Sequence, residues 1–247
     1  MALRNEFKTQ GDFLFKNRSY IPIIAVLVAL YIYTTDKNIK EFNLIGLDVY
    51  SFEIMCFLVC LLGLLIRVLA VGYSSDNTSG RNTTVGQKAD SINRTGLYSL
   101  FRHPLYIGNY FMWIGIAAFT QNFWFLLAFT FWYMLYYERI MYAEEEFLIS
   151  TYGQDYLDFS ANTPAVLPRF KNWTKPANSF SFIKIIRQEK TGILNLFLVI
   201  FIFKLARFLF TDDPIEMRWI YGLGIGVIWY LIVKVLQKTT KVLEFDR

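Results

Sequence analysis

Two short groups of polar residues carry the chemistry that this sequence can do. Arg102 and His103, the only histidine, precede Pro104. Proline is tolerated in the first turn of a helix because its missing N–H would be unpaired there, so a helix is expected to begin here. The N–H groups of a helix start, its positive dipole end and two basic side chains together suit a carboxylate or a phosphate. A helix cap or an interface residue is the alternative interpretation of His103.

The second group is a run of three glutamates, Glu144 to Glu146, which follows a long apolar stretch. If a helix ended here, the acids would lie at its negative dipole end, which is unfavourable by up to about 1 kcal/mol, so a compensating partner is expected. If the helix continues, Glu138, Tyr142 and Glu145 share one face by their spacing, with Arg139 beside it. A solvated acidic patch is the alternative.

The elements that position these groups are predicted to be transmembrane helices. The chain of 247 residues is 55% hydrophobic and 19% aromatic, with a mean hydropathy of +0.33, which is outside the usage of ordinary globular domains. Apolar runs predict six spans at about residues 20–34, 49–73, 105–119, 123–142, 193–210 and 219–236. A bilayer core of about 30 Å takes roughly 20 helical residues, so the first and third runs are short.

The basic residues indicate the orientation, because positively charged loops stay in the cytoplasm. With the N-terminus inside, the segments assigned to the cytoplasm hold seventeen Lys and Arg residues, and the outer loops hold three. We therefore expect both termini and both polar groups on the cytoplasmic side. Five further cations fall within the apolar runs and are expected to reach the headgroups with their long side chains: Arg67, Arg139, Lys204, Arg207 and Lys234.

Other features are interpreted as packing or as membrane anchoring. Cys56 and Cys60 lie inside the second apolar run, where buried free thiols fit better than a disulfide or metal ligands, and no metal site is expected. Gly222, Gly224 and Gly226 lack the neighbouring strand of a dinucleotide fingerprint and predict close helix packing. Residues 180–190 mix bulky apolar side chains with cations, which predicts a helix in the headgroup layer. The net charge of +5 marks orientation here and does not indicate nucleic acid.

In their joint order and spacing, the motifs resemble the membrane methyltransferases that include isoprenylcysteine carboxyl methyltransferases and phospholipid methyltransferases. The matching text runs from Gly96 through Arg102-His103-Pro104 to Gly108, then Arg139, Glu144-Glu145, Leu148, Tyr152-Gly153, Tyr156 and Pro168. It covers about residues 96–169, roughly a third of the chain. Neither short motif is specific alone, and the two C-terminal spans depart from the smallest members of the family.

The resemblance implies that S-adenosylmethionine occupies a cytoplasmic pocket and that a lipid enters from the bilayer. The residues that match the cofactor site are His103, Tyr106, Gly108, Glu144 and Glu145. The chemistry of these side chains agrees, because the cofactor carries a carboxylate for cations, an amino group and hydroxyls for carboxylates, and a sulfonium for aromatic faces. Methyl transfer is an in-line displacement, so the protein mainly aligns the reactants and excludes water.

The arginines favour an anionic methyl acceptor. An amine must lose a proton to a base, whereas a carboxylate or a phosphate needs only cations to hold it. We expect Arg102, Arg139 and Glu145 to act in catalysis, and Arg81, Arg94 and Arg139 to bind the substrate. Residues 77–84 also resemble a bacterial subgroup assigned as lipid A phosphate methyltransferases, which implies a lipid phosphate acceptor and the bacterial inner membrane.

The prediction is an all-α polytopic bundle that forms one integral membrane domain over residues 1–247. A methyltransferase core is expected at about residues 49–170 and additional helices at about 178–237. The expected activity is O-methylation of an anionic lipid group. The alternatives are carboxyl methylation of a prenylated cysteine, amine methylation of a phospholipid headgroup, an NADPH-dependent membrane reductase, and a transporter or scaffold without enzymatic activity. The oligomeric state stays open.

Overall fold

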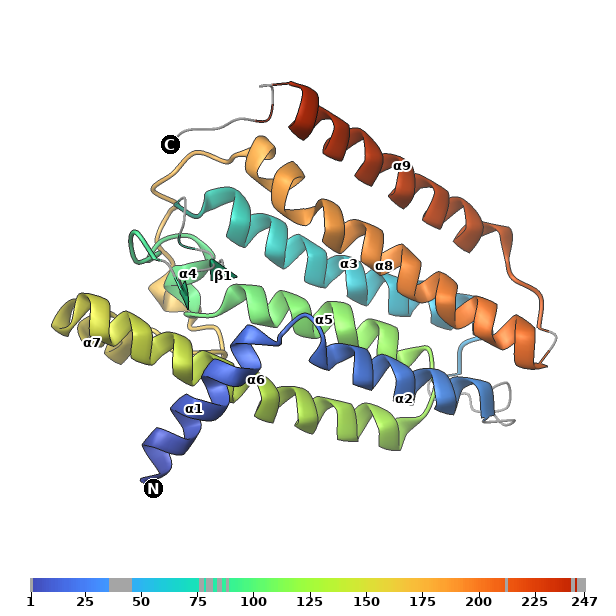
Figure 1. The fold of residues 1–247 in the computed structure, drawn as a ribbon, viewed down its shortest axis with the longest axis horizontal. Coiled ribbons are helices and arrows are strands. Elements are labelled where there is room, and N and C mark those ends of the chain that lie inside the picture. The colour runs from blue at the N-terminus through green and yellow to red at the C-terminus, as the bar shows by residue number, and fades with distance from the viewer. Residues whose placement is uncertain are drawn as a thin grey trace.

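The computed structural model describes residues 2–35, 46–75, 78, 82–83, 86–87, 89–211, 213–240 and 243. Arg81, a predicted substrate-binding residue, lies outside the described residues. The elements in chain order are α1 (Leu3–Lys16), α2 (Ile21–Thr35), α3 (Val49–Tyr73), β1 (Asn82–Thr83), β2 (Gly86–Gln87), α4 (Leu97–Leu100), α5 (Pro104–Ala118), α6 (Phe123–Tyr152), α7 (Gln154–Asn162), a 3-10 turn (Phe170–Asn172), α8 (Phe182–Thr211) and α9 (Met217–Thr239). The long helices run side by side, and α1 crosses them at an angle (Figure 1).

Three of the described helices, α3, α8 and α9, are long and apolar enough to cross a membrane. The pair α1 and α2, bent by 73° at their junction, passes the same test together and makes a fourth candidate. These helices support the prediction of an integral membrane protein. Helices α2 and α5 have 15 residues each, which at about 1.5 Å per residue fall short of a bilayer core of about 30 Å. The count of six spans stays a prediction.

Helix α6 continues through all three glutamates and ends at Tyr152. The Asn122 side chain caps its start by accepting from the Phe125 N–H at 2.9 Å. At its end the chain turns into α7 at Gly153, whose φ of 56° lies in the left-handed region that favours glycine. The glutamates are therefore not at the negative end of the helix dipole. The acids are instead satisfied by side chains from neighbouring elements.

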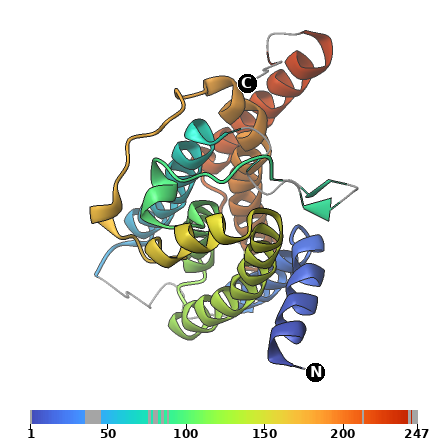
Figure 2. The ribbon, with the colours of Figure 1, turned by 90° about the vertical axis from the view of Figure 1, so that its left-hand side faces the viewer.

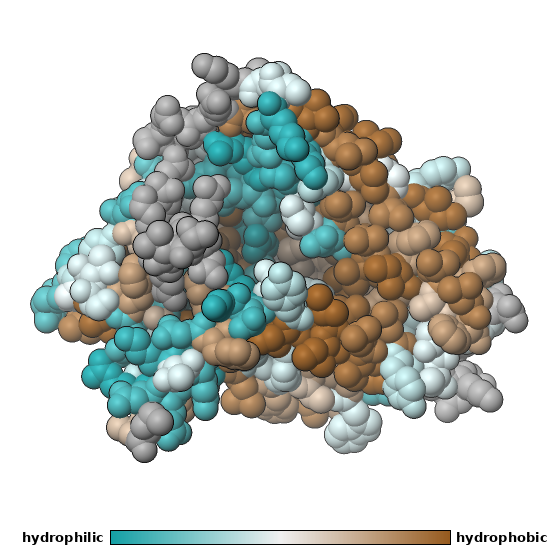
Figure 3. All heavy atoms as spheres, in the orientation of Figure 1, coloured by the Kyte–Doolittle hydropathy of each residue, from teal (hydrophilic) through white to brown (hydrophobic). Residues whose placement is uncertain are grey.

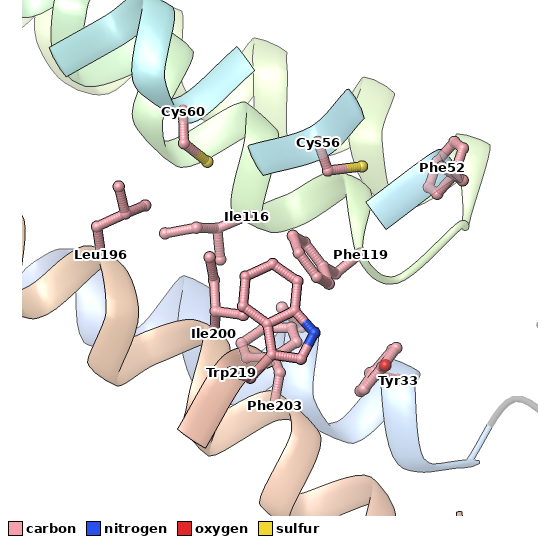
Figure 4. Packing of buried hydrophobic residues seen from close by; sticks show 11 residues of the cluster. Tyr33, Phe52, Cys56, Cys60, Ile116, Phe119, Leu196, Ile200, Phe203 and Trp219 are labelled. Atoms are coloured by element: carbon pink, nitrogen blue, oxygen red, sulfur yellow. The ribbon is translucent and has the colours of Figure 1, made fainter. Parts of the chain in front are cut away.

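The main hydrophobic core joins α2, α3, α5, α8 and α9 (Figure 4). Trp219 of α9 lies at its centre and meets Phe119, at the end of α5, edge to face at 5.8 Å. Cys56 and Cys60 are buried free thiols of α3 in this core, which confirms their interpretation as packing residues. The predicted close packing is confirmed for Gly222 and Gly226 of α9, since a Cβ at either would contact the Phe197 ring of α8. It is wrong for Gly224, where a Cβ would have no atom within 4 Å.

Cations of α8 are buried in ion pairs, which corrects the expectation that they reach the headgroups. Lys204 and Arg207 are each 7% exposed. Lys204 pairs with Glu53 of α3, and Arg207 Nε donates to Asp213 Oδ2 at 2.8 Å. Glu53 also accepts from Arg218 Nη2 at 2.6 Å. A buried charge needs such partners because desolvation of a lone ion is expensive. The ion pairs thus join α3, α8, the segment before α9 and the first turn of α9.

Helix α8 also differs from the prediction at its start. The residues expected to form a helix in the headgroup layer are the first turns of α8, which runs without a break from Phe182 to Thr211. Ser181 at this start donates its backbone N–H to the Gly72 carbonyl at 3.0 Å, and buried Lys184 donates to the Ser74 carbonyl at 2.8 Å. The beginning of α8 is therefore fixed against the end of α3.

Candidate active site

The start of α5 is held in place by the segment that follows α7. Pro104 is the first helical residue, as predicted, and His103 is the residue before the helix. The backbone N–H of Arg102 donates to the Pro164 carbonyl at 2.9 Å, and that of His103 to the Ala165 carbonyl at 3.2 Å. These two N–H groups are therefore used within the fold. Figure 2 looks onto this end of the molecule, where α4, α7 and the segment between α7 and α8 lie.

Arg102, His103 and Glu145 form one largely buried cluster between the start of α5 and α6. The guanidinium of Arg102 donates to both carboxylate oxygens of Glu145, at 2.9 and 3.0 Å. His103 Nε2 lies 2.7 Å from Glu145 Oε1. Arg102 Nη1 also donates to the carbonyls of Ser160 and Thr163 at the end of α7. Glu145 is thus the centre of a network that fixes both basic side chains.

Glu144 faces the other side of the same histidine. His103 Nδ1 lies 3.5 Å from Glu144 Oε2, and the Tyr106 hydroxyl donates to that oxygen at 3.0 Å. The His103 and Tyr106 rings are stacked with centroids 5.6 Å apart, and Tyr137 packs on Tyr106 at 4.8 Å. A carboxylate and aromatic faces therefore meet at one place, which suits an ammonium or a sulfonium group.

These residues line a pocket of about 800 Å³. Its polar part includes Tyr98, Arg102, His103, Tyr106, Asn109 and Glu144. Its apolar part includes Pro22, Ile23 and Val26 of α2, Ile116 of α5, and Val199 and Ile202 of α8. Figure 3 shows the viewed face hollowed near its middle, with hydrophilic atoms in and above the hollow and hydrophobic surface to its right. The pocket therefore joins a polar end to apolar helices.

The structure brings some of the predicted site residues together and leaves others apart. Glu145 does not line the pocket and lies behind His103 and Arg102. Arg94 forms an ion pair with Asp155 on the surface. The arginine of α6, Arg139, contacts α1, with its guanidinium 3.5 Å from the centroid of the Phe7 ring.

Gly108 lies at the contact between α5 and α3, outside the pocket lining. A Cβ there would lie 2.6 Å from Arg67 Cγ and 2.8 Å from the Gly63 carbonyl oxygen. We expect Gly108→Ala to destabilise the fold by about 2 kcal/mol through overpacking, while the folded fraction keeps its affinity for S-adenosylmethionine. Thermal unfolding and ligand titration of the purified variant test this. A selective loss of S-adenosylmethionine binding at unchanged stability would instead place Gly108 in the pocket.

Sequence reasoning missed several polar pocket residues, among them Arg67 and Asn109, and the acid that holds Arg67. Arg67 was expected to reach the headgroups and instead lies in the pocket, paired with this acid. Arg67 of α3 donates to Glu189 of α8 through Nε at 2.9 Å and Nη2 at 2.7 Å. Its third nitrogen, Nη1, donates to Asn109 Oδ1 at 2.6 Å. Arg67 lies within one apolar run, and Glu189 lies just before another. Charged residues at such positions usually pair with each other, so these two charges were the signal that could have indicated the pair.

The two carboxylates favour the charged form of His103. Burial by itself lowers the pKa of His103, but the hydrogen bonds and charges of Glu144 and Glu145 outweigh it, and the pKa is raised above 6.5. Burial by itself raises the pKa of Glu145, but His103 and Arg102 outweigh it, and the pKa is lowered. Protonated His103 thus stabilises the fold below pH 6.5, and this contribution is lost as pH rises through its folded pKa. The contribution of Glu145 is lost as pH falls through its own lowered pKa.

We expect the thermal unfolding midpoint of the wild-type protein to fall as pH rises above 6.5, because His103 loses its proton as the pH passes its raised folded pKa. His103→Gln removes the titrating group and should flatten this part of the profile. Unfolding followed by tryptophan fluorescence in detergent measures both curves. A wild-type profile that parallels that of His103→Gln would show that His103 does not titrate between its two glutamates.

Comparisons with known proteins match the segment of the chain that contains these side chains. Residues 52–155 match the phospholipid methyltransferase family. The chain is 30% identical over 101 residues to the cobalt-zinc-cadmium resistance protein CzcN of Cupriavidus metallidurans, covering 38% of this chain and 46% of that protein. It is 29% identical over 111 residues to a protein-S-isoprenylcysteine O-methyltransferase of Tribolium castaneum (44% of this chain, 39% of the relative). A protein of the same name from Xenopus laevis is 28% identical over 142 residues (57% and 45%).

The chain thus spans less than half the length of the curated relatives it matches. No solved structure matches it. Within the described part of the chain, no group of three or more His, Cys, Asp or Glu side chains is arranged to hold a metal ion.

Proposed function

From the phospholipid methyltransferase family domain that residues 52–155 carry, we propose that this protein is an S-adenosylmethionine-dependent O-methyltransferase that acts on an anionic group of a membrane lipid. One observation carries the proposal. A single pocket joins the cluster of Glu144, Tyr106 and His103 to the apolar walls of α2 and α8. A hydrophilic methyl donor and a lipid acceptor can meet in such a pocket, because the donor can bind the polar side chains at one end and the lipid chain can pack on the apolar side chains at the other.

The polar end fits the methyl donor. Glu144, already bonded to Tyr106 and beside His103, offers carboxylate oxygens to the donor's amino group or ribose hydroxyls. The Tyr106 face suits the sulfonium. Glu145 and Arg102 act as positioning residues that hold His103 and the start of α5. S-adenosylmethionine supplies the methyl group, which passes to the acceptor oxygen as the new C–O bond forms and the C–S bond breaks.

The apolar end fits a lipid that enters from the bilayer. Ile23, Leu198 and Ile202 line the pocket and are 51%, 36% and 36% exposed. We infer that the pocket opens between the apolar helices α2 and α8, which supply these residues. With six spans and both termini inside, as the charge distribution predicts, this opening lies at the cytoplasmic leaflet.

The acceptor is an oxyanion, with a lipid phosphate such as that of lipid A as the first candidate. An anionic oxygen attacks the methyl group without losing a proton, so the site needs hydrogen-bond donors and no general base. The carboxylate of a prenylated cysteine is the second candidate, because two relatives are named protein-S-isoprenylcysteine O-methyltransferase. Both acceptors demand the same chemistry from the pocket.

Cofactor binding separates this proposal from a membrane reductase. Purified protein in detergent is titrated with S-adenosylmethionine and, separately, with NADPH, and binding is followed by equilibrium dialysis. We expect saturable binding of S-adenosylmethionine and none of NADPH. Saturable binding of NADPH alone would contradict the proposed function, and binding of neither would favour a transporter or scaffold.

A further inference from the structure

One face of α5 lines the pocket from the polar helix start to the apolar interior. Arg102 and His103, just before the helix, line the pocket together with the α5 residues Tyr106, Asn109, Met112 and Ile116. Asn109 lies about 4.5 Å beyond Tyr106 along the helix axis, and the apolar part begins one turn after it. The headgroup of a lipid whose chain occupies the apolar part would therefore lie beside Asn109, between its chain and the donor site.

The orientation of the Asn109 amide is fixed by Arg67. Arg67 Nη1 lies 2.6 Å from the amide atom assigned as Oδ1. A guanidinium only donates hydrogen bonds, so the atom that faces it must be the amide oxygen. The amide nitrogen is then on the other side and donates one N–H to the Tyr137 hydroxyl at 3.5 Å, and Tyr137 also lines the pocket. Asn109 thus has its second N–H as a donor for a ligand at the junction of the polar and apolar parts.

Arg67 is itself held by an acid from outside the family-matched region. Its Nε and Nη2 donate to the two carboxylate oxygens of Glu189, which is 1% exposed. Glu189 belongs to α8, beyond residues 52–155. Such a bidentate pair fixes the guanidinium plane. Because α8 also supplies the wall residues Val199 and Ile202, one ion pair ties this wall to the amide on α5.

Resting on the proposed function, we propose that Asn109 hydrogen-bonds the anionic oxygen of the lipid acceptor and that Arg67 and Glu189 are positioning residues that orient its amide. The Glu189 carboxylate balances the charge of Arg67, so the group that meets the acceptor is a neutral donor with a cation behind it. Such a donor favours an oxyanion over an ammonium headgroup. It also leaves the oxyanion free to attack, since no full ion pair holds it.

Binding of octyl phosphate tests the assignment, because this probe carries the phosphate and a short chain without needing catalysis. Trp113 lines the pocket, so tryptophan fluorescence of the purified protein can follow the titration. We expect Asn109→Asp to weaken octyl phosphate binding at least about 10-fold, because it replaces donors by a repelling carboxylate. Binding of octyl glucoside, which has the same chain and no charge, should stay unchanged.

Glu189→Gln tests the positioning residues. The glutamine amide has one acceptor oxygen in place of two, so only one of the two hydrogen bonds that Arg67 donates to the carboxylate keeps its acceptor. The guanidinium plane of Arg67 and the orientation of the Asn109 amide are then less fixed. We expect octyl phosphate binding to weaken about 3-fold to 10-fold while S-adenosylmethionine affinity is retained. If the pair had a purely structural role, Glu189→Gln would weaken the binding of both ligands together. Asn5→Asp, on the exposed surface of α1, is the matched control and should bind both ligands as the wild-type protein does.

The outcomes distinguish this inference from the proposed function. Wild-type protein that binds S-adenosylmethionine and octyl phosphate, with only the phosphate weakened by Asn109→Asp, supports the inference. Equal octyl phosphate affinity in the wild-type protein and Asn109→Asp, or no octyl phosphate binding at all, would overturn it. If Asn109→Asp instead lost binding of S-adenosylmethionine and kept binding of octyl phosphate, the inference would be overturned too, because Asn109 would then belong to the donor end. Failure of the proposed function appears separately, as a wild-type protein that does not bind S-adenosylmethionine.

Discussion

Replacing Glu144 by alanine is expected to reduce the affinity for S-adenosylmethionine by about 100-fold or more and to abolish methyl transfer. Glu144 lines the pocket and lies within hydrogen-bonding distance of Tyr106. Its two oxygens are the carboxylate acceptors that the polar end offers to the donor's amino group and hydroxyls. Each charge-assisted hydrogen bond contributes about 1.5–3 kcal/mol, so two such bonds account for the expected loss. Equilibrium dialysis with labelled S-adenosylmethionine measures it.

Glu138→Ala is the matched control for this variant. Glu138 belongs to the same helix, is exposed and pairs with Arg139 outside the pocket. It should leave the affinity for S-adenosylmethionine unchanged. A Glu144→Ala protein that is folded and binds S-adenosylmethionine as tightly as Glu138→Ala would remove Glu144 from the donor site.

Replacing Arg102 by alanine is expected to destabilise the protein by about 3 kcal/mol and to abolish activity. Arg102 holds Glu145 in two hydrogen bonds and reaches the carbonyls of Ser160 and Thr163. Its side chain is 14% exposed and that of Glu145 is 21% exposed, so removing the cation leaves a largely buried carboxylate with only His103 beside it. Chemical unfolding in detergent, followed by tryptophan fluorescence, measures the change.

The double variant Arg102→Ala, Glu145→Ala separates stability from catalysis. Removing the second partner removes the uncompensated charge, so part of the stability should return while activity does not. Arg94→Ala serves as the control, because its pair with Asp155 lies on the surface and contributes little. If Arg102→Ala unfolds like Arg94→Ala, the buried network does not hold the start of α5.

Those parts of the site could be predicted from the sequence whose positions depend on residues nearby in the chain. The proline after His103 sets the start of α5, and that start places His103 and Tyr106 one turn apart on one face. The all-helical fold follows in the same way from the apolar runs. These features depend on neighbours in the chain, which is the information that a single sequence contains.

The rest of the site depends on partners that are far apart in the chain. Arg67 and Glu189 are separated by 122 positions, and no local spacing indicates that they meet. Charge alone could not show that Arg94 and Arg139 have partners on the surface and on α1, nor that Glu145 binds Arg102 from behind the pocket. An arginine near a predicted site therefore suggests substrate binding from the sequence alone, but a structure that shows it paired with a carboxylate removes that inference.

The most direct test of the account is methyl transfer itself. Purified protein in liposomes containing bacterial lipid extract is incubated with methyl-labelled S-adenosylmethionine, and the lipids are analysed by mass spectrometry with fragmentation. The account predicts a lipid that is heavier by one labelled methyl group, placed on a phosphate or carboxylate oxygen, and absent with Glu144→Ala. Label on a headgroup amine would contradict the anionic acceptor, and no labelled lipid from protein that binds S-adenosylmethionine would contradict lipid methylation.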